Sequence, residues 1–189
     1  AQALGLDPDL PTLLVTGGSL GALHVNESMT GAADALPEGA QVVHLTGRGK
    51  DEPVRAAVEK AGLSDRWHVI DYLTTMEDAL AVADLVVCRS GAGTVAEMEA
   101  LGLPCIYVPL PIGNGEQRLN AADHVAAGGA QLIDDKDFTA DFVRRNVFPL
   151  LGSTRLADMA AASQSLGRAG AARALADLAL EQVKEAGNE

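Results

Sequence analysis

The chain has 189 residues, of which 48% are apolar and only 3% aromatic, and its formal net charge is -12. This length suits one α/β domain with a sizeable core and is too short for two full domains. The acidic charge, with no basic cluster longer than the pair Arg144 and Arg145, argues against a nucleic-acid backbone or an anionic lipid surface as the partner of this chain.

Short runs rich in Val, Ile and Leu alternate with longer Ala-rich amphipathic stretches, which is typical of repeated strand–helix units and therefore of a parallel sheet. In chain order, we expect strands at residues 12–16, 41–45, 67–70, 84–88, 104–108 and 130–133. The helices between them are expected at 21–35, 52–61, 76–82, 94–101 and 117–127. Two or three further helices, at 141–151, 153–164 and 169–185, form a C-terminal tail whose predicted N-caps are Thr139 and Ser153.

Neither the cysteines nor the histidines form a recognisable catalytic or metal-binding motif. Cys88 and Cys105 each lie in an apolar run, where a thiol behaves as a small buried hydrophobe, and no CxxC or Cys/His spacing indicates zinc. We expect structural or surface roles for the histidines, His24, His44, His68 and His124.

No apolar run approaches the roughly 18 residues of a membrane-spanning helix, which predicts a cytoplasmic protein. The opening segment lacks an initiator Met and passes quickly into a predicted strand, which indicates a cut at a domain boundary.

The strand-to-helix loops are where function is expected, because ligands of a doubly wound sheet bind beyond the C-terminal ends of the strands. Four of these loops carry unusual residues: GGSLGA at 17–22, YLTTM at 72–76, CRSGAGTVAE at 88–97 and PLPIGNGEQRLN at 109–120. In the first, Gly17, Gly18 and Ser19 form a tight turn before a helix, whose N–H groups and dipole favour a phosphate. An ordinary tight turn is the alternative. The loop matches neither GxGxxG nor GxxxxGK[ST], which disfavours dinucleotide oxidoreductases and P-loop NTPases.

A second anion-binding turn is predicted ahead of the helix at 94–101, from the small residues Ser90, Gly91, Ala92 and Gly93. Thr94 suits the start of this helix. Glu97 lies one turn further on, close to the expected anion, where a carboxylate would repel phosphate. We interpret Glu97 as a residue that accepts hydrogen bonds from a ribose diol, the alternative being a favourable position in the helix dipole. Arg89 lies beside this turn and either orients the loop or meets a phosphate, the alternative being a salt bridge to a neighbouring carboxylate.

The loop at 109–120 contains three candidate sugar contacts, Asn114, Glu116 and Gln117, next to glycines that let the backbone approach a ligand. Amides and carboxylates suit this task because each can hold paired hydroxyl groups in a fixed geometry. Helix capping by Asn114 is the alternative explanation for that residue.

Three segments together, GGSLGALHVNE, VVCRSGAGTVAEMEALGLPCIYVPLP and GNGEQRLNAADHVAAGGAQLI, closely resemble the C-terminal domain of the MurG family, over roughly residues 10–150. The resemblance implies an α/β fold: residues 1–150 would be the Rossmann-like, donor-binding half of a glycosyltransferase B fold. Residues 151–189 would be a helical tail, and an N-terminal acceptor domain would be absent from this chain.

The resemblance also implies an inverting hexosyltransferase, which transfers GlcNAc from UDP-GlcNAc to a lipid-linked muramoyl pentapeptide (lipid I to lipid II) in peptidoglycan synthesis. The general base and the lipid-facing surface would lie in the N-terminal domain, so the fragment alone is expected to be inactive. The full-length enzyme would be a peripheral protein on the cytoplasmic face of the cell membrane. No cofactor and no metal is implied for donor binding, because helix N-termini would stabilise the leaving UDP.

By the same resemblance, the donor contacts would be Gly18, Ser19, Leu73, Met76, Ser90, Ala92, Gly93, Thr94, Glu97, Glu116 and Gln117. The glycine and serine of the first loop and the small-residue turn would face the diphosphate. Leu73 would offer backbone hydrogen bonds to uracil, Met76 would pack near the base, and Glu97 would hold the ribose. The family commonly has two adjacent glutamines in the sugar loop, whereas this chain has Glu116 before Gln117; a glutamate side chain accepts hydrogen bonds but cannot donate them.

Two other readings fit the same residues. One is another UDP-sugar enzyme of this fold, such as a UDP-GlcNAc 2-epimerase or a lipid glycosyltransferase, which acceptor specificity would distinguish. The other is a nonenzymatic nucleotide-binding or interaction module with a flavodoxin-like sheet, which an absence of UDP-dependent stabilisation would favour.

Overall fold

A single parallel sheet forms the centre of the computed structural model, which describes residues 1–18, 22–112 and 114–167. Its strands are β1 (Thr12–Thr16), β2 (Gln41–Leu45), β3 (Trp67–Ile70), β4 (Leu85–Cys88), β5 (Cys105–Tyr107) and β6 (Ala130–Leu132). Their order in the sheet is β3-β2-β1-β4-β5-β6, with every neighbouring pair parallel. The chain therefore builds outward from β1 to β3 and then returns to the other side of β1. This reversal between β1 and β4 is the topological switch point, where ligands of such sheets bind.

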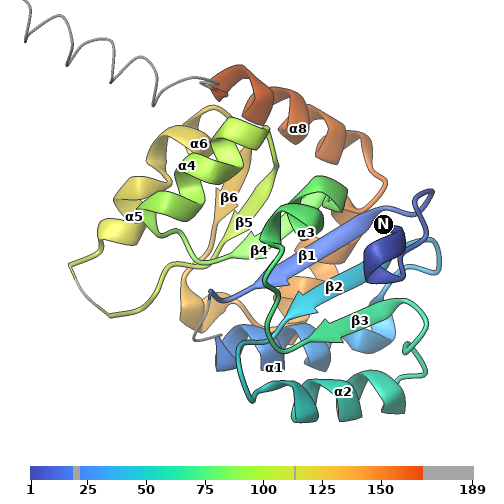
Figure 1. Ribbon diagram of the computed structural model, residues 1–189. Coiled ribbons are helices and arrows are strands. Elements are labelled where there is room, and N and C mark those ends of the chain that lie inside the picture. The colour runs from blue at the N-terminus through green and yellow to red at the C-terminus, as the bar shows by residue number, and fades with distance from the viewer. Residues whose placement is uncertain (19–21, 113, 168–189) are drawn as a thin grey trace, which may run out of the picture.

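Helices cover both faces of the sheet (Figure 1). One face packs against α1 (Leu23–Gly31), α2 (Asp51–Lys60), α7 (Ala140–Phe142), the π-helical turn η4 (Val143–Val147) and the 3-10 turn η5 (Phe148–Leu150). The other face packs against α3 (Met76–Val82), α4 (Ala92–Leu101) and α6 (Ala122–Ala126), and α5 (Glu116–Asn120) contacts α4 and α6. The last described helix, α8 (Thr154–Leu166), packs against α4, and the remaining short 3-10 turns are η1 (Gln2–Leu4), η2 (Ala33–Ala35) and η3 (Asp135–Asp137).

Because both faces are covered, the strands read as continuous apolar runs instead of an alternating pattern. Within β1, Leu13 and Val15 point into one core and Leu14 into the other, and all three are fully buried. Burying a side chain of this size contributes roughly 1.5–3 kcal/mol, so these runs hold the sheet in register. The predicted α/β class and all six predicted strands are confirmed, with ends that differ by at most one residue.

The helix predictions were right in position and partly wrong in extent. The first helix begins at Leu23 and ends at Gly31, followed by η2, and the predicted helix at 117–127 is two helices that meet at Ala121. At Ala121 the ψ angle opens to -3°, which interrupts the α-helical hydrogen-bond ladder. The predicted helix at 141–151 is instead α7, η4 and η5, since Pro149 lacks an N–H and cannot continue an α-helix.

Both predicted N-caps of the C-terminal region are present. The side chain of Thr139 accepts a hydrogen bond from the Phe142 N–H, and that of Ser153 accepts one from the Leu156 N–H, each over 3.2 Å. The predicted helix at 169–185 lies outside the described residues. Of the helices that are described, none has both the length and the apolar character that a membrane span requires.

The buried histidines have structural roles, as expected. Trp67 Nε1 donates to His44 Nδ1 over 3.3 Å, so the other ring nitrogen of His44 carries the proton and donates to Asn26 Oδ1 over 3.0 Å. Asn26 Nδ2 in turn donates to the Thr46 carbonyl over 3.1 Å. This cluster joins α1 to the end of β2. Complete burial lowers the pKa of His44 to about 3.

Candidate functional site

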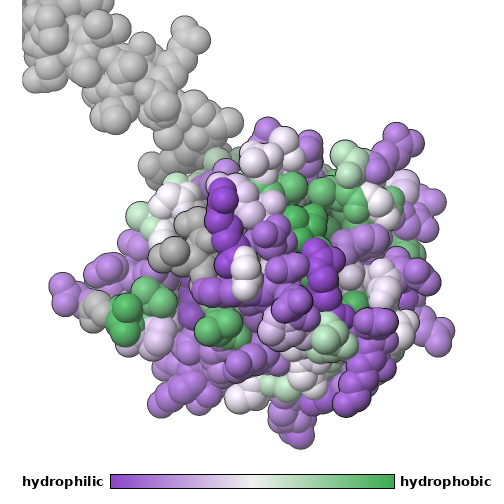
Figure 2. Space-filling model, turned by 60° about the horizontal axis from the view of Figure 1, so that its bottom comes forward, coloured by the Kyte–Doolittle hydropathy of each residue, from purple (hydrophilic) through white to green (hydrophobic). Residues whose placement is uncertain are grey.

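A pocket of about 290 Å³ opens at the switch point, beyond the C-terminal ends of β1, β2, β3 and β4. Its size is at the lower end of the range for small-molecule sites. Five of the sequence-predicted contacts line it together, although they come from three different loops: Gly18, Leu73, Met76, Thr94 and Glu97. Figure 2 shows that hydrophilic side chains dominate the face that comes forward when the bottom of Figure 1 is turned to the viewer, with hydrophobic side chains in separate groups.

One end of this pocket is apolar and includes an aromatic ring. Leu73 and Met76 lie there with Tyr72, whose side chain is 40% exposed. The guanidinium carbon of Arg48 lies 3.8 Å from the centroid of the Tyr72 ring, a cation–π contact that restrains the ring. A flat apolar surface edged by backbone groups suits a nucleobase, which stacks on aromatic and aliphatic side chains.

The start of α4 forms a second wall of the pocket. Its N-cap is Gly91, which has extended dihedrals and makes no side-chain capping bond. The N–H groups of the first turn, at Ala92, Gly93 and Thr94, therefore point away from the helix without intrahelical acceptors, as at any helix start. Together with the helix dipole they form a positive site for an anion. Ala92 and Gly93 are exposed at this position, while Thr94 and Glu97 face the pocket.

Ser90 precedes this turn and is completely buried. Its hydroxyl group finds no hydrogen-bond partner among the residues that the structure describes. Its carbonyl oxygen accepts a hydrogen bond from Asn120 Nδ2 over 3.1 Å, which ties the turn to α5. An unsatisfied buried hydroxyl costs free energy and is a reason to look for a ligand or an ordered water nearby.

The first loop contributes Gly18, which has a φ of +79° and therefore a conformation that favours glycine. The Gly18 N–H donates to Thr16 Oγ1 over 3.3 Å. The prediction for Ser19 falls on a residue outside the described ones. The helix that follows, α1, starts at Leu23 and has no side-chain N-cap bond.

The predicted sugar contacts do not line this pocket. Gln117 lines a neighbouring pocket of about 350 Å³ with Leu110, Arg118 and Asp135, and its Oε1 accepts a hydrogen bond from the Leu110 N–H over 2.9 Å. Glu116 is exposed and lines neither pocket. Asn114 is exposed too, and it does not cap α5, because the N-cap there is Gly115 and has no side-chain capping bond.

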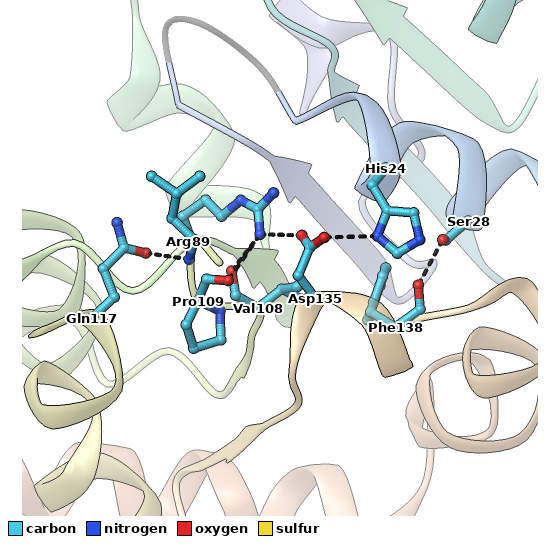
Figure 3. Close-up of polar contacts among 9 residues, drawn as sticks. His24, Ser28, Arg89, Val108, Pro109, Gln117, Asp135 and Phe138 are labelled. Atoms are coloured by element: carbon cyan, nitrogen blue, oxygen red, sulfur yellow. Dashed lines mark hydrogen bonds and ion pairs between the residues drawn. The ribbon is translucent and has the colours of Figure 1, made fainter. Parts of the chain in front are cut away.

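Arg89 pairs with a carboxylate, which is the alternative that the sequence left open. Its Nη1 atom lies 2.5 Å from Asp135 Oδ1 and donates to the carbonyl oxygens of Val108 and Pro109 over 3.0 and 3.1 Å (Figure 3). The other carboxylate oxygen of Asp135 lies 3.1 Å from His24 Nδ1 on α1. Arg89 also lines the main pocket, so its charge is held at the edge of the candidate site.

Sequence reasoning missed several residues at this edge of the sheet. Gly47 and Tyr72 line the pocket, Arg48 packs on Tyr72, and Asp135 anchors Arg89. The loop that contains Gly47 and Arg48 follows β2 at the same edge as the four loops that were singled out, so the strand-end rule would have found it. Cys88, expected to be purely structural, is buried and also lines the pocket. Within the described part of the chain, no group of three or more His, Cys, Asp or Glu side chains could hold a metal ion.

Comparisons with known proteins identify the family of the chain. The family model described as glycosyltransferase family 28 C-terminal domain matches residues 12–175. The UDP-N-acetylglucosamine–N-acetylmuramyl-(pentapeptide) pyrophosphoryl-undecaprenol N-acetylglucosamine transferase of Paenarthrobacter aurescens is 48% identical over 185 residues, which are 96% of this chain and 49% of that protein. The enzyme of the same name from Bifidobacterium adolescentis is 50% identical, over 80% of this chain and 42% of that protein. The chain thus spans about half the length of the curated relatives that it matches.

Solved structures extend the comparison. The crystal structure of Acinetobacter baumannii MurG superposes with a TM-score of 0.81 at 28% identity, covering 94% of this chain and 51% of that one. A UDP-GlcNAc 2-epimerase from Neisseria meningitidis, solved with UDP-GlcNAc, superposes with a TM-score of 0.62 at 18% identity, over 95% of this chain and 47% of that one. The second likeness is one of fold alone.

Proposed function

The chain belongs to the glycosyltransferase family 28 C-terminal domain family, and from this membership we propose that it is the donor-binding half of an inverting N-acetylglucosaminyltransferase. The reaction transfers GlcNAc from UDP-GlcNAc to the lipid-linked muramoyl pentapeptide of peptidoglycan synthesis. The observation that carries the proposal is the single pocket that joins Gly18, Leu73, Met76, Thr94 and Glu97 at the switch point. It offers an apolar end for a base, a carboxylate for a ribose and a helix start for a phosphate.

In this proposal, the nucleoside occupies the apolar end. Uracil lies against Tyr72 and Met76 and takes backbone hydrogen bonds from Leu73. Glu97 accepts hydrogen bonds from the two ribose hydroxyls, which explains a carboxylate so close to an anion site. Its position in α4 allows this, because Glu97 lines the pocket beside Thr94.

The diphosphate occupies the space between the first loop and the start of α4. Gly18 faces it from one side, and Ala92, Gly93 and Thr94 at the start of α4 face it from the other, while the buried Ser90 supports the turn beneath them. When the glycosidic bond breaks, negative charge develops on the UDP leaving group, and preorganised N–H groups stabilise that charge without reorganising. No metal or cofactor is needed for donor binding in this scheme.

The GlcNAc moiety extends toward the loop at 109–117. Gln117 Oε1 already accepts a hydrogen bond from the Leu110 N–H. The NH₂ group of the same side chain is therefore the part that donates to a sugar hydroxyl. Glu116, the neighbour of Gln117, could supply only an acceptor to the sugar, because a carboxylate has no N–H to donate.

The remaining parts of the reaction are assigned to an N-terminal domain. We propose that residues 1–150 form the donor-binding domain, that 151–189 form a helical tail, and that a preceding acceptor domain supplies the general base and the lipid-facing surface. The full-length enzyme acts as a peripheral protein on the cytoplasmic face of the membrane, where its lipid-linked acceptor is held. This chain alone binds the donor and does not turn it over.

Isothermal titration of the chain with UDP-GlcNAc, UDP-GalNAc and ADP-glucose tests the proposal. We expect saturable binding of the uridine nucleotides and none of ADP-glucose. Glu97→Ala should weaken UDP and UDP-GlcNAc alike by about ten- to a hundredfold, the range for losing hydrogen bonds to a charged group. Glu52→Ala, which removes an exposed carboxylate from the first turn of α2, is the matched control and should change neither. Absence of any nucleotide binding would favour a nonenzymatic module.

A further inference from the structure

Asp135 lies at the meeting point of three loops at the C-terminal edge of the sheet (Figure 3). It begins η3, directly after β6, and its side chain is only 15% exposed. One carboxylate oxygen pairs with Arg89, just after β4. The other lies 3.1 Å from His24 Nδ1, on the first turn of α1, without the geometry of a hydrogen bond. The segment after η3 is fixed to α1, because Ser28 Oγ donates to the Phe138 carbonyl over 2.6 Å. Asp135 is therefore held by its ion pair with Arg89, on a segment that is itself fixed to α1.

Arg89 connects Asp135 to the loop at 109–117, which is proposed to contact the sugar. The atom that pairs with Asp135, Nη1, also donates to the carbonyl oxygens of Val108 and Pro109, at the start of that loop. The next residue, Leu110, donates its N–H to Gln117 Oε1 over 2.9 Å. A continuous series of contacts thus runs from Asp135 through Arg89 and the loop backbone to the side chain proposed to contact GlcNAc.

The same ion pair restrains the charge of Arg89. Arg89 lines the nucleotide pocket, yet its side chain is only 15% exposed and its Nη1 atom is committed to Asp135 and two carbonyl groups. A guanidinium free of Asp135 could instead turn toward a diphosphate, which it binds well. Asp135 therefore determines whether Arg89 supports the sugar loop or the phosphate.

We propose that Asp135 is a positioning residue for sugar recognition: it holds Arg89 on the backbone of the 109–117 loop and so sets the placement of Gln117. This inference rests on the proposed function, since it assumes that a nucleotide sugar occupies the site. It assigns Asp135 no contact with the donor. Its effect falls on the sugar part of the donor and spares the nucleotide part, which Leu73, Thr94 and Glu97 line from other elements.

The test compares Asp135→Asn with Asp137→Asn, which makes the same change of charge in the same turn at an exposed side chain that forms no ion pair within the described part of the chain. Each variant and the wild type are titrated with UDP and with UDP-GlcNAc. We expect Asp135→Asn to weaken UDP-GlcNAc by about two- to tenfold relative to UDP, no more than the loss of Gln117 itself, while UDP affinity is unchanged or higher. Asp137→Asn should leave the ratio at the wild-type value.

Two further measurements separate positioning from a general loss of stability. Hydrogen exchange of residues 109–118 without ligand should speed up in Asp135→Asn and not in Asp137→Asn. In the double variant Asp135→Asn/Gln117→Ala, the two losses of sugar affinity should not add, because both act through one contact.

Equal weakening of UDP and UDP-GlcNAc by Asp135→Asn, or a ratio that matches that of Asp137→Asn, would overturn the inference and leave the proposed function intact. Additive losses in the double variant would also overturn it. A wild-type chain that binds no uridine nucleotide would instead remove the proposed function, and this inference with it.

Discussion

The two ends of the candidate site are built in different ways. At the nucleotide end, the groups that face the pocket come from the first turn of α4, the Gly18 turn and the start of α3, all directly attached to strands of the sheet. At the sugar end, a loop with exposed Leu110 and Ile112 is held by side chains, through the Arg89–Asp135 ion pair and the Gln117–Leu110 hydrogen bond. In the proposed function, groups fixed by the ends of the strands would recognise the nucleotide, whereas a loop held by long-range side-chain contacts would recognise the sugar.

This difference predicts that changes at the nucleotide end affect UDP and UDP-GlcNAc equally, and that changes at the sugar end affect UDP-GlcNAc alone. The first prediction below concerns the stability of the fold beneath the nucleotide end. Each later variant is expected to change the affinity either for both ligands or for UDP-GlcNAc alone.

The largest expected effect concerns the support beneath the nucleotide end, where His44 and Asn26 hold the Thr46 carbonyl next to Gly47. Burial lowers the pKa of His44 to about 3, against 6.5 for an ordinary histidine, so the unfolded chain takes up the proton more readily. The stability that neutral His44 provides is complete above about pH 6.5 and is lost progressively as the pH falls toward 3. Between pH 7 and 4.5 this loss is about 2–3 kcal/mol.

Urea denaturation at these two pH values checks the prediction. His44→Gln, which cannot titrate, should lower stability at pH 7 and show a smaller difference between pH 7 and 4.5 than the wild type. If the variant and the wild type lost equal stability in acid, His44 would not be the group responsible.

Next in size is the effect of Tyr72 on the base. Tyr72→Ala removes the ring that lines the pocket beside Arg48 and should weaken both UDP and UDP-GlcNAc by about three- to tenfold, the usual worth of an aromatic contact. Tyr72→Phe keeps the ring and should bind both ligands as the wild type does. A loss of affinity for UDP-GlcNAc alone would place Tyr72 at the sugar end and contradict its assignment to the base.

At the sugar end, Gln117→Ala should weaken UDP-GlcNAc by about two- to tenfold, as expected for one or two neutral hydrogen bonds, and leave UDP unchanged. Calorimetric titration with both ligands measures this, with Gln2→Ala, at an exposed residue of η1, as the control. Equal weakening of both ligands would show that Gln117 acts on the fold of the site and does not contact the sugar.

The smallest effect is expected at Glu116. Glu116→Gln adds a donor and removes a negative charge from an exposed position, so UDP-GlcNAc affinity should rise by about twofold, within the limit of roughly 1 kcal/mol for exposed charges. Glu116→Ala removes the charge without adding a donor and tells the two causes apart. A fall in affinity with Glu116→Gln would mean that the carboxylate itself accepts from the sugar.

The difference between the two ends also explains which features could be predicted from the sequence. All six strands and the small-residue turn before α4 follow from local patterns, because apolar runs and small-residue turns act over a few neighbouring residues. Five of the predicted contacts therefore meet in one pocket. The Thr139 and Ser153 caps were found for the same reason.

The long-range bridges could not be predicted. Asp135 lies 46 residues from Arg89 in the chain, and only the placement of β6 at the far side of β5 brings η3 over the end of β4. Nothing near Arg89 in the sequence identifies its partner among the 26 acidic residues of the chain.

The donor site is tested most directly by a ¹H–¹⁵N NMR titration of the chain with UDP and then, separately, with UDP-GlcNAc. We expect amide shifts at Gly18, Leu73 and the first turn of α4 with either ligand, and additional shifts at Leu110 and Gln117 with UDP-GlcNAc alone. Identical shifts with both ligands would contradict the separation of the two ends. Shifts confined to another surface, such as the pocket beside Trp67 and His68 on the edge strand, would contradict the assignment of the donor site itself.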